Sequence, residues 1–402
     1  MRASARMLAV VALIAPLAPE AGAAPLVSIV EDDAQILRSG PQARERALDD
    51  WQALGADMVR VTVVWRDADP AALANLDAAV AGARARGMRV LLTPTGPGPR
   101  TASRCRPRRD VCDPSPAAFG AWVSSLAARY PQVRDWAIWN EPNNRNWLQP
   151  QRTKRGVTSP RLYRALASAA TAAIRADPAH SEDLVLVGET APVFRSRGTP
   201  LAEQMVEADV FLRELFRSGG VPLADALSHH PYTGGLSSPS GPAARSQYSL
   251  AGLSRLRAVA RDAKLRRRLR TSDVWLTELG FQTNPPDRIF GMPPARQASF
   301  IAQAERLAER GGARSIAQYV LVDETASAGF QSGLRFADGR PKPSYRGYQA
   351  PLVVIREGAR LVIWGRVRPV REAGTVVPVR DRAGRKLWQG RPVAGGSFGA
   401  TV

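Results

Sequence analysis

Lysine is scarce in this chain, which has only four among its 402 residues: Lys154, Lys264, Lys342 and Lys386. Arginine supplies nearly all of the 56 basic residues, and against 36 acidic residues it gives a formal net charge of +20. A basic face could bind nucleic acid, an anionic polymer or an anionic membrane. The arginines are scattered, however, with local clusters only at 104–109 and 266–270. We therefore favour a general preference for arginine and expect no nucleic-acid partner.

Cysteine and histidine are also rare, with two and three residues. Cys105 and Cys112 have no histidine near them in sequence, so they do not form a tetrahedral zinc site, and we expect no metal. In an exported protein so close a pair predicts a disulfide that closes one loop. No G-x-G-x-x-G or Walker pattern occurs, which argues against the alternative fold, an open doubly wound sheet. We expect no cofactor.

Long apolar runs are missing beyond the first residues, so stable membrane insertion is not expected. The chain opens with Arg2 and Arg6, the apolar run Met7–Leu17 and the small residues 21–24. This order is typical of a bacterial Sec-type signal peptide over residues 1–23, whose apolar part is too short for an anchor. We expect a secreted protein; a disordered N-terminus or an uncleaved tether is the alternative.

Between residues 26 and 350, apolar strand patterns alternate with helical ones eight times. The predicted strands are Leu26–Val30, Asp57–Trp65, Met88–Thr93, Val133–Asn140, Asp183–Gly188, Ala226–Tyr232, Val274–Gly280 and Ser315–Val322. The predicted helices are Pro41–Leu54, Pro70–Arg86, Ser115–Tyr130, Pro160–Ala176, Leu201–Arg217, Leu250–Leu269, Pro294–Arg310 and Ser344–Gln349. Eight such units predict an α/β protein with a (β/α)8 TIM barrel.

The last segment, 351–402, has no helical periodicity. Its short apolar runs are separated by Gly and Pro, which predicts a small β-sandwich-like domain. The predicted strands are Leu352–Ile355, Arg360–Val367, Thr375–Arg380 and Lys386–Trp388. Such a domain could bind glycan or pack on the barrel, and we favour packing.

The links that follow the predicted strands are long, whereas those that follow the helices are brief. Long loops on one face of a barrel indicate where the substrate binds. Two strands end there in a carboxylate: the run Trp136–Ile138 leads through Trp139 and Asn140 to Glu141, and Val274–Thr277 leads to Glu278. Two carboxyl groups about 5–5.5 Å apart can cleave a glycosidic bond with retention of configuration.

These two motifs resemble the retaining glycoside hydrolases of clan A, and most closely family 39 and related bacterial exopolysaccharide hydrolases. The resemblance covers 27–348 and rests on Asn140-Glu141 after the fourth strand and Glu278 after the seventh. It implies a β-glycosidase in which Glu141 is the acid/base and Glu278 the nucleophile. The substrate would be a polysaccharide or glycoconjugate.

The resemblance extends to four further side chains. Asn140 would hydrogen-bond the sugar 2-hydroxyl, and Arg60 would hold the nucleophile ionised. His230 and Tyr232 match a pair near the nucleophile, where the tyrosine can donate a hydrogen bond to Glu278. A structural histidine remains the alternative for His230.

Aromatic side chains offer flat apolar surfaces to sugar rings, and Trp65, Trp139 and Trp147 are the candidates. Trp136 and Trp275 lie within strands and should belong to the core. The chain departs from the family pattern at Gln318 and Tyr319, where a tryptophan often lies beneath the sugar, and after the third strand, which lacks a frequent histidine.

Two other functions remain open. A barrel that binds glycan without cleaving it would keep the fold, although both carboxylates are present. A basic envelope protein could bind an anionic polymer through its arginines.

Glu189, at the end of the fifth strand, is a third carboxylate at the mouth; it ranks below Glu141 as the acid because no Asn precedes it.

Overall fold

The computed structural model describes residues 25–107, 109–192, 200–233, 238–241, 248–325, 329–369, 375–393 and 395–402. The predicted signal peptide, 1–23, lies outside the described residues. In the part that is described, no helix is both long enough and apolar enough to cross a membrane.

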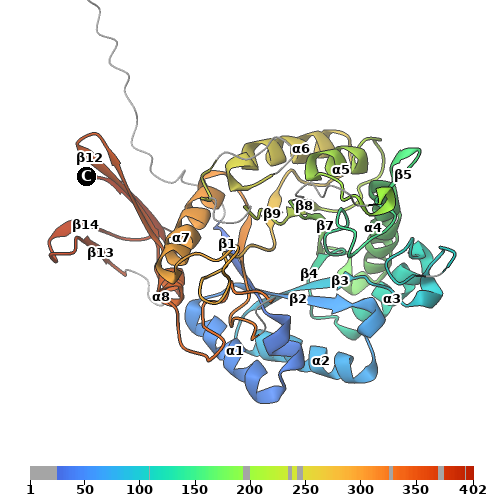
Figure 1. Cartoon of the computed structure of the whole chain (residues 1–402), viewed down its shortest axis with the longest axis horizontal. Coiled ribbons are helices and arrows are strands. Elements are labelled where there is room, and N and C mark those ends of the chain that lie inside the picture. Colours follow the sequence, from blue (N-terminus) through green and yellow to red (C-terminus); the bar gives the residue numbers. More distant parts are fainter. Residues whose placement is uncertain are drawn as a thin grey trace, which may run out of the picture.

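Eight parallel strands form one sheet in the order β10-β1-β2-β3-β4-β7-β8-β9, and helices surround it (Figure 1). The strands are β1 (Val27–Glu31), β2 (Met58–Val64), β3 (Arg89–Thr95), β4 (Asp135–Ala137), β7 (Leu184–Thr190), β8 (Ala226–His229), β9 (Val274–Leu276) and β10 (Ser315–Tyr319). The helices are α1 (Pro41–Leu54), α2 (Pro70–Ala85), α3 (Pro116–Arg129), α4 (Ser159–Ala176), α5 (Ala208–Leu215), α6 (Leu253–Leu265), α7 (Pro294–Arg310) and α8 (Pro343–Gln349). The (β/α)8 prediction is confirmed.

The joint between β9 and β10 lacks a regular ladder, and a side chain bridges it instead. The Ser315 hydroxyl accepts a hydrogen bond from the Leu276 N–H at 2.9 Å and donates one to the Leu276 carbonyl at 3.0 Å. Tyr319 N–H donates to the Leu279 carbonyl at 2.8 Å near the mouth. These contacts bring the first and last strands of the sheet together and nearly close the barrel.

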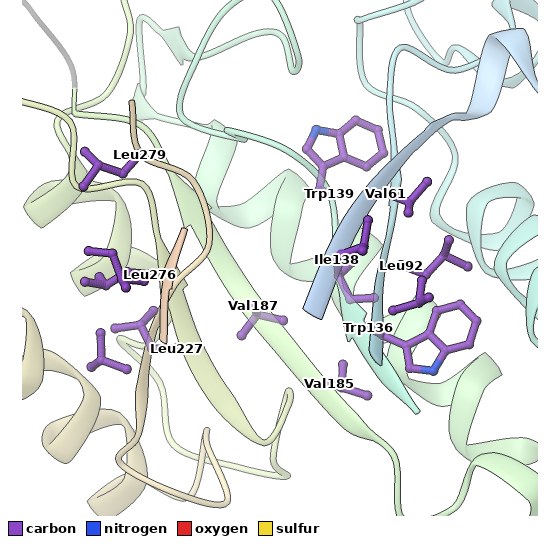
Figure 2. Packing of buried hydrophobic residues seen from close by; sticks show 14 of the residues in the cluster. Val61, Leu92, Trp136, Ile138, Trp139, Val185, Val187, Leu227, Leu276 and Leu279 are labelled. Atoms are coloured by element: carbon purple, nitrogen blue, oxygen red, sulfur yellow. The ribbon is translucent and has the colours of Figure 1, made fainter. Parts of the chain in front are cut away.

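The barrel interior is filled at its middle by one apolar residue from each strand. The eight are Ile29, Met58, Leu91, Ala137, Leu186, Ala226, Trp275 and Ala317, and we call them the apolar ring. A second, larger cluster lies between the strands and the helices; Figure 2 shows part of it, with Val61, Leu92, Ile138 and Val187 among its members. The two clusters follow from the alternation of side chains along each strand. Trp136 and Trp275 are both buried, as predicted.

Several predicted bounds were wrong, chiefly where loops intervene. The fourth strand and the fifth helix are shorter than predicted, because the chain turns away from regular structure towards the mouth. The long loop after β4 contains an unpredicted hairpin of β5 (Arg152–Thr153) and β6 (Gly156–Val157). A last strand, β15 (Ser397–Thr401), was also missed.

The C-terminal segment forms two small antiparallel sheets. One has the order β11-β12-β15 and the other pairs β13 with β14; their bounds are β11 (Leu352–Glu357), β12 (Arg360–Arg366), β13 (Val377–Arg380) and β14 (Lys386–Gly390). Trp388 of one sheet stacks on Phe398 of the other, with ring centroids 5.1 Å apart. Trp364 donates a hydrogen bond to Glu309 of α7 at 2.5 Å, and Arg368 is paired with Glu305 of the same helix. This β-rich segment therefore packs on α7 (Figure 1).

Candidate active site

Polar side chains lie directly above the apolar ring, because residues two positions further along a strand face the same side. The polar residues Glu31, Arg60 and Thr277 lie two positions after three members of the apolar ring, Ile29, Met58 and Trp275. All three are buried and belong to one hydrogen-bonded group. The strands thus carry an apolar layer in mid-barrel and a charged layer at the mouth.

Arg60 is the centre of this charged layer. Its Nη1 lies 2.6 Å from a carboxylate oxygen of Glu31 and 3.2 Å from Oε2 of Glu278. Its Nη2 donates to Glu189 and to the amide oxygen of Asn140, each at 2.8 Å. Burial opposes the charge on Arg60, but the carboxylates around it raise its pKa further above its usual range. Arg60 therefore stays a cation and fixes the positions of its four partners.

Glu278 is held from two sides. Besides the Arg60 contact, its Oε1 accepts a hydrogen bond from the Tyr232 hydroxyl at 2.6 Å. Burial and the charge of Glu278 raise the pKa of Tyr232 well above its usual value, so the phenol keeps its proton and remains a donor. These two partners fix the orientation of the Glu278 carboxyl group and leave its side chain 12% exposed at the mouth.

Glu141 faces Glu278 across the mouth. Its Oε2 accepts a hydrogen bond from the Asn144 amide at 2.8 Å, and its Oε1 lies 3.2 Å from Nδ1 of His230. The same nitrogen lies 3.6 Å from Oε2 of Glu278. An oxygen of each carboxylate and a ring nitrogen of His230 all lie within 4.8 Å of one another. This spacing suits direct attack by one carboxylate while the other handles a proton.

Burial separates these two carboxylates from the others in the group. The side chains of Glu141 and Glu278 are 14% and 12% exposed, whereas those of Glu31 and Glu189 are 4% and 0% exposed. Glu189 also accepts hydrogen bonds from Arg60 at 2.8 Å and from Thr277 at 2.8 Å. It lies beneath the mouth, and only Glu141 and Glu278 of this group are open to a substrate.

His230 links the buried and the exposed carboxylates, since its Nε2 lies 3.2 Å from Glu189. Burial disfavours the imidazolium, but the charge of Glu278 and hydrogen bonds to Glu141 and Glu189 outweigh it and raise the pKa of His230 to about 10. Burial likewise opposes ionisation of Glu189, but Arg60 and His230 lower its pKa to about 2. The neighbouring His229 has its pKa lowered to about 3 by burial and by the charge of His230.

The backbone is left-handed where the functional side chains leave the strands. Trp139, Glu141 and Glu189 have φ angles of 73°, 40° and 41°, a conformation that costs residues with a side chain about 1–2 kcal/mol each. The turn at Trp139 ends the alternation of β4, so that Trp139 packs edge-on against Phe119 of α3 and Asn140 meets Arg60. The backbone strain thus orients the amide and the carboxyl group that follow the strand.

The cluster Glu141, His230 and Glu278 is the one set of potential metal ligands that the described residues bring together. The protein charges already present fit a cation poorly. His230 is protonated at neutral pH, since its pKa is raised to about 10, and Arg60 lies 3.2 Å from Glu278. A protonated imidazole has no lone pair to offer a metal.

The structure brings together five of the predicted site residues with Glu278: Arg60, Asn140, Glu141, His230 and Tyr232. Trp65 and Trp147 are half-buried and make no hydrogen bond to this group within the described residues. Trp65 stacks on Trp122 of α3 at 5.7 Å. Trp139 is fully buried, so its suggested role as a sugar platform was wrong.

Sequence reasoning missed Glu31 and Asn144. Glu31 is the nearest partner of Arg60, and burial raises its pKa to about 7 despite the Arg60 charge. A buried arginine in a strand required acidic partners, and an acidic residue two positions after an inward Ile29 was the available signal. Asn144 gave no such signal, because its position depends on the loop after β4.

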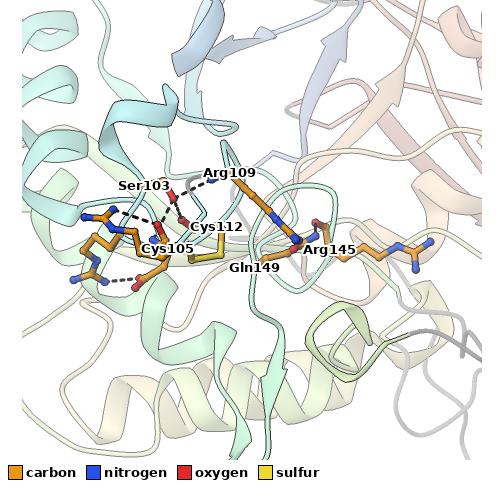
Figure 3. The surroundings of a disulfide bond; sticks show 9 residues. Ser103, Cys105, Arg109, Cys112, Arg145 and Gln149 are labelled. Carbon is orange, nitrogen blue, oxygen red and sulfur yellow. Dashed lines mark hydrogen bonds and ion pairs between the residues drawn. A yellow bond between two sulfur atoms is a disulfide. The ribbon is translucent and has the colours of Figure 1, made fainter.

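That loop is braced by the disulfide between Cys105 and Cys112, which confirms the predicted pairing. Gln149 donates its N–H to the Val111 carbonyl at 2.8 Å and accepts from the Asp113 N–H at 2.7 Å. Figure 3 shows Gln149 beside the disulfide, with Ser103 donating to the Cys112 carbonyl at 2.8 Å. The cross-linked loop after β3 therefore supports the loop that carries Asn144 and Trp147.

No protein-family profile matches the chain, and no curated protein matches it in sequence. Solved structures do match it. An exo-β-1,4-mannosidase from Opitutaceae bacterium strain TAV5 is 16% identical with a TM-score of 0.55, over 85% of this chain and 61% of the mannosidase. This chain thus corresponds to less than two thirds of that enzyme's length.

Two further structures are similar over most of their length. A fungal β-1,4-galactanase is 16% identical with a TM-score of 0.55, over 81% of this chain and 99% of the galactanase. A GH5_18 protein from Streptomyces cattleya, solved in complex with GlcNAc, is 17% identical with a TM-score of 0.56, over 81% of this chain and 79% of that protein. At these identities the likeness shows the barrel fold.

Proposed function

We propose that this protein is a retaining β-glycosidase that acts by double displacement. The observation that carries the proposal is the pair of partly exposed carboxylates, Glu141 and Glu278, with oxygens no more than 4.8 Å apart above a buried cationic centre. Glycoside hydrolysis needs two such groups at the rim of a barrel. The similar mannosidase and galactanase have the same fold and support the same reaction class.

In this mechanism Glu278 attacks the anomeric carbon while Glu141 gives its proton to the leaving oxygen. Arg60 and Tyr232, at 3.2 and 2.6 Å from Glu278, hold the nucleophile in place and aim it. Formation of the ester bond removes the negative charge of Glu278. Glu141, now a carboxylate, takes a proton from water, and that water attacks the anomeric carbon and releases Glu278.

Asn140 would form a hydrogen bond with the sugar itself. Its amide oxygen is occupied by Arg60 at 2.8 Å, and this contact orients the amide NH2 group as a donor. A hydrogen bond from that group to the 2-hydroxyl would strengthen in the transition state. Trp65 and Trp147 would contribute apolar surface on the loops after β2 and β4.

Two narrower proposals rest on the sequence. The motifs around Glu141 and Glu278 resemble family 39 and related bacterial exopolysaccharide hydrolases, so a polysaccharide or glycoconjugate is the proposed substrate. Secretion is proposed from the signal-peptide pattern, and the disulfide Cys105–Cys112 is compatible with an oxidising, extracellular environment.

The test is chemical rescue of the two carboxylate variants on aryl β-glycosides, with β-1,4-mannan and β-1,4-galactan as the first polymers. Glu278→Ala should lose at least about 10⁴-fold in kcat, and azide should restore turnover as the α-glycosyl azide. Glu141→Ala should instead yield the β-glycosyl azide, because azide then attacks the glycosyl-enzyme. Glu203→Ala removes a carboxylate that faces Arg145 at 3.9 Å and should leave activity unchanged.

Turnover by Glu278→Ala that equals the wild type would exclude this residue as the nucleophile. A wild type that binds glycans but cleaves none of a broad panel would favour the non-catalytic alternative.

A further inference from the structure

An open groove of about 670 Å³ lies beside the β5–β6 hairpin, at the start of α4. Its lining is Thr153, Lys154, Arg155, Val157, Thr158 and Arg161. Three of these six residues are cations, and no carboxylate is among them. Since the hairpin belongs to the loop that follows β4, the groove lies on the same face of the barrel as Glu141. Figure 1 shows the hairpin projecting beside α4.

The three cations differ from the other basic residues of this loop. Arg145 faces Glu203 at 3.9 Å, and Arg152 is paired with Glu207 at 2.8 Å. The side chains of Lys154, Arg155 and Arg161, by contrast, form neither an ion pair nor a hydrogen bond with any residue that the structure describes, and all three are exposed. Three unpaired charges of one sign around a hollow repel one another, so an anion bound among them would be stabilised.

The groove is joined rigidly to the catalytic loop through Gln151, which is fully buried. Its side-chain amide donates to the carbonyls of Pro142 at 3.0 Å and Leu148 at 2.6 Å. Its side-chain oxygen accepts from the Ser159 hydroxyl at 3.0 Å. One side chain therefore connects the residue after Glu141 to the first residue of α4, and the groove has a fixed place relative to the acid/base.

We propose that this groove binds acidic sugar units, bearing carboxylate or sulfate groups, of the polysaccharide that is cleaved at the mouth. The inference rests on the proposed function and adds to it the class of substrate. Arg155 and Arg161 can form paired hydrogen bonds with such groups, and the hydroxyls of Thr153 and Thr158 can bond sugar hydroxyls. Among the residues that the structure describes, no aromatic side chain lines the groove, which disfavours stacking of nucleic-acid bases.

The test measures binding of polygalacturonate and of neutral β-1,4-galactan to the full chain, with and without Lys154→Gln, Arg155→Gln and Arg161→Gln together. The matched control is Arg46→Gln, Arg84→Gln and Lys264→Gln. It removes the same three charges from exposed positions on α1, α2 and α6. Binding does not require turnover, so failure of the groove and failure of the glycosidase proposal would be seen separately.

The groove variant should bind polygalacturonate about tenfold more weakly than the wild type at low salt. The slope of the logarithm of its binding constant against the logarithm of salt concentration should be less steep by about two to three. The control should change by less than about twofold, and galactan binding should not change in either variant. Equal losses in groove and control variants, or none in the groove variant, would overturn the inference. Groove-dependent binding of duplex DNA that is as tight as that of polygalacturonate would overturn the assignment to polysaccharide.

Discussion

The apolar ring and the charged layer above it are built by the same strands, two residues apart, yet they differ in what holds them together. Leu91 and Leu186 of the ring need only close packing. Arg60 and Glu189 are equally buried, and they are tolerated because each charge has at least two partners. Strand alternation therefore places a stabilising layer and a reactive layer at adjacent levels, and the reactive one depends on complete pairing.

Removing the central cation, Arg60, should have the largest effect on the stability of the charged layer. Arg60→Met leaves Glu31 and Glu189 buried without their main partner, and the free energy of unfolding should fall by about 3–5 kcal/mol. Urea denaturation measures the loss. Adding Glu31→Gln and Glu189→Gln to the same variant should recover much of it, since the orphaned charges are then gone. A loss below about 1 kcal/mol for Arg60→Met would mean that the layer is not held by this pairing.

Titration of His230 should make the charged layer sensitive to alkaline pH. Its pKa is raised to about 10 in the folded protein, against about 6.5 when unfolded, so its stabilisation is complete below pH 6.5. That contribution is lost as the pH rises through 10, and the total is on the order of 5 kcal/mol. His230→Asn should flatten the decline of unfolding free energy between about pH 6.5 and 10. An unchanged slope in the variant would contradict the assignment of the charge to His230.

Glu189 should make the same layer sensitive to acidic pH, because its contribution to stability is lost as the pH falls and not as it rises. Its pKa is lowered to about 2 from about 4.5, so its contribution is present above pH 4.5 and lost as the pH falls towards 2. The apolar ring contains no titrating group, so its contribution to the unfolding free energy should not depend on pH.

Truncation within the apolar ring should cost stability without altering the chemistry. Leu91→Ala removes a fully buried side chain and should lower the unfolding free energy by about 3 kcal/mol. The activity of the folded fraction should stay within a few-fold of the wild type. Leu352→Ala, at a leucine that is 44% exposed in β11, is the matched control and should cost below about 0.5 kcal/mol. Calorimetry and specific activity together decide the outcome.

The disulfide should have the smallest effect, because it supports a loop outside both layers. Replacing Cys105 and Cys112 with Ser releases a link across a sequence separation of 7 and should cost about 2 kcal/mol. Since Gln149 ties this loop to the one that carries Asn144, KM should rise more than kcat falls. Loss of activity as complete as in Glu278→Ala would show that the loop does more than support its neighbour.

Much of the barrel could be predicted because its signals are local. The helical spacing and the terminal Pro or Gly gave the bounds of α1 and α7 as observed. The β5–β6 hairpin and β15 were missed because strands of two or five residues are too short to show a clear alternation of apolar and polar residues.

The two exposed carboxylates were predicted from the ends of the strands, and Arg60, Asn140, His230 and Tyr232 around them from the resemblance, whereas Glu31 and Asn144 were not predicted. The role of Glu31 depends on which face of β1 points inward, and that is set by the whole barrel. Trp139 was misjudged because its left-handed backbone, with φ of 73°, reverses the direction that strand alternation implies. Features that depend on long-range register or on backbone strain are not carried by local sequence patterns.

The most direct test of double displacement is the anomeric form of the first product, read by proton NMR during hydrolysis of a β-glycoside. With oxygens of Glu141 and Glu278 no more than 4.8 Å apart, no water fits between nucleophile and sugar, and the initial product should be the β-anomer. Initial formation of the α-anomer would contradict the assignment of Glu278 as a nucleophile.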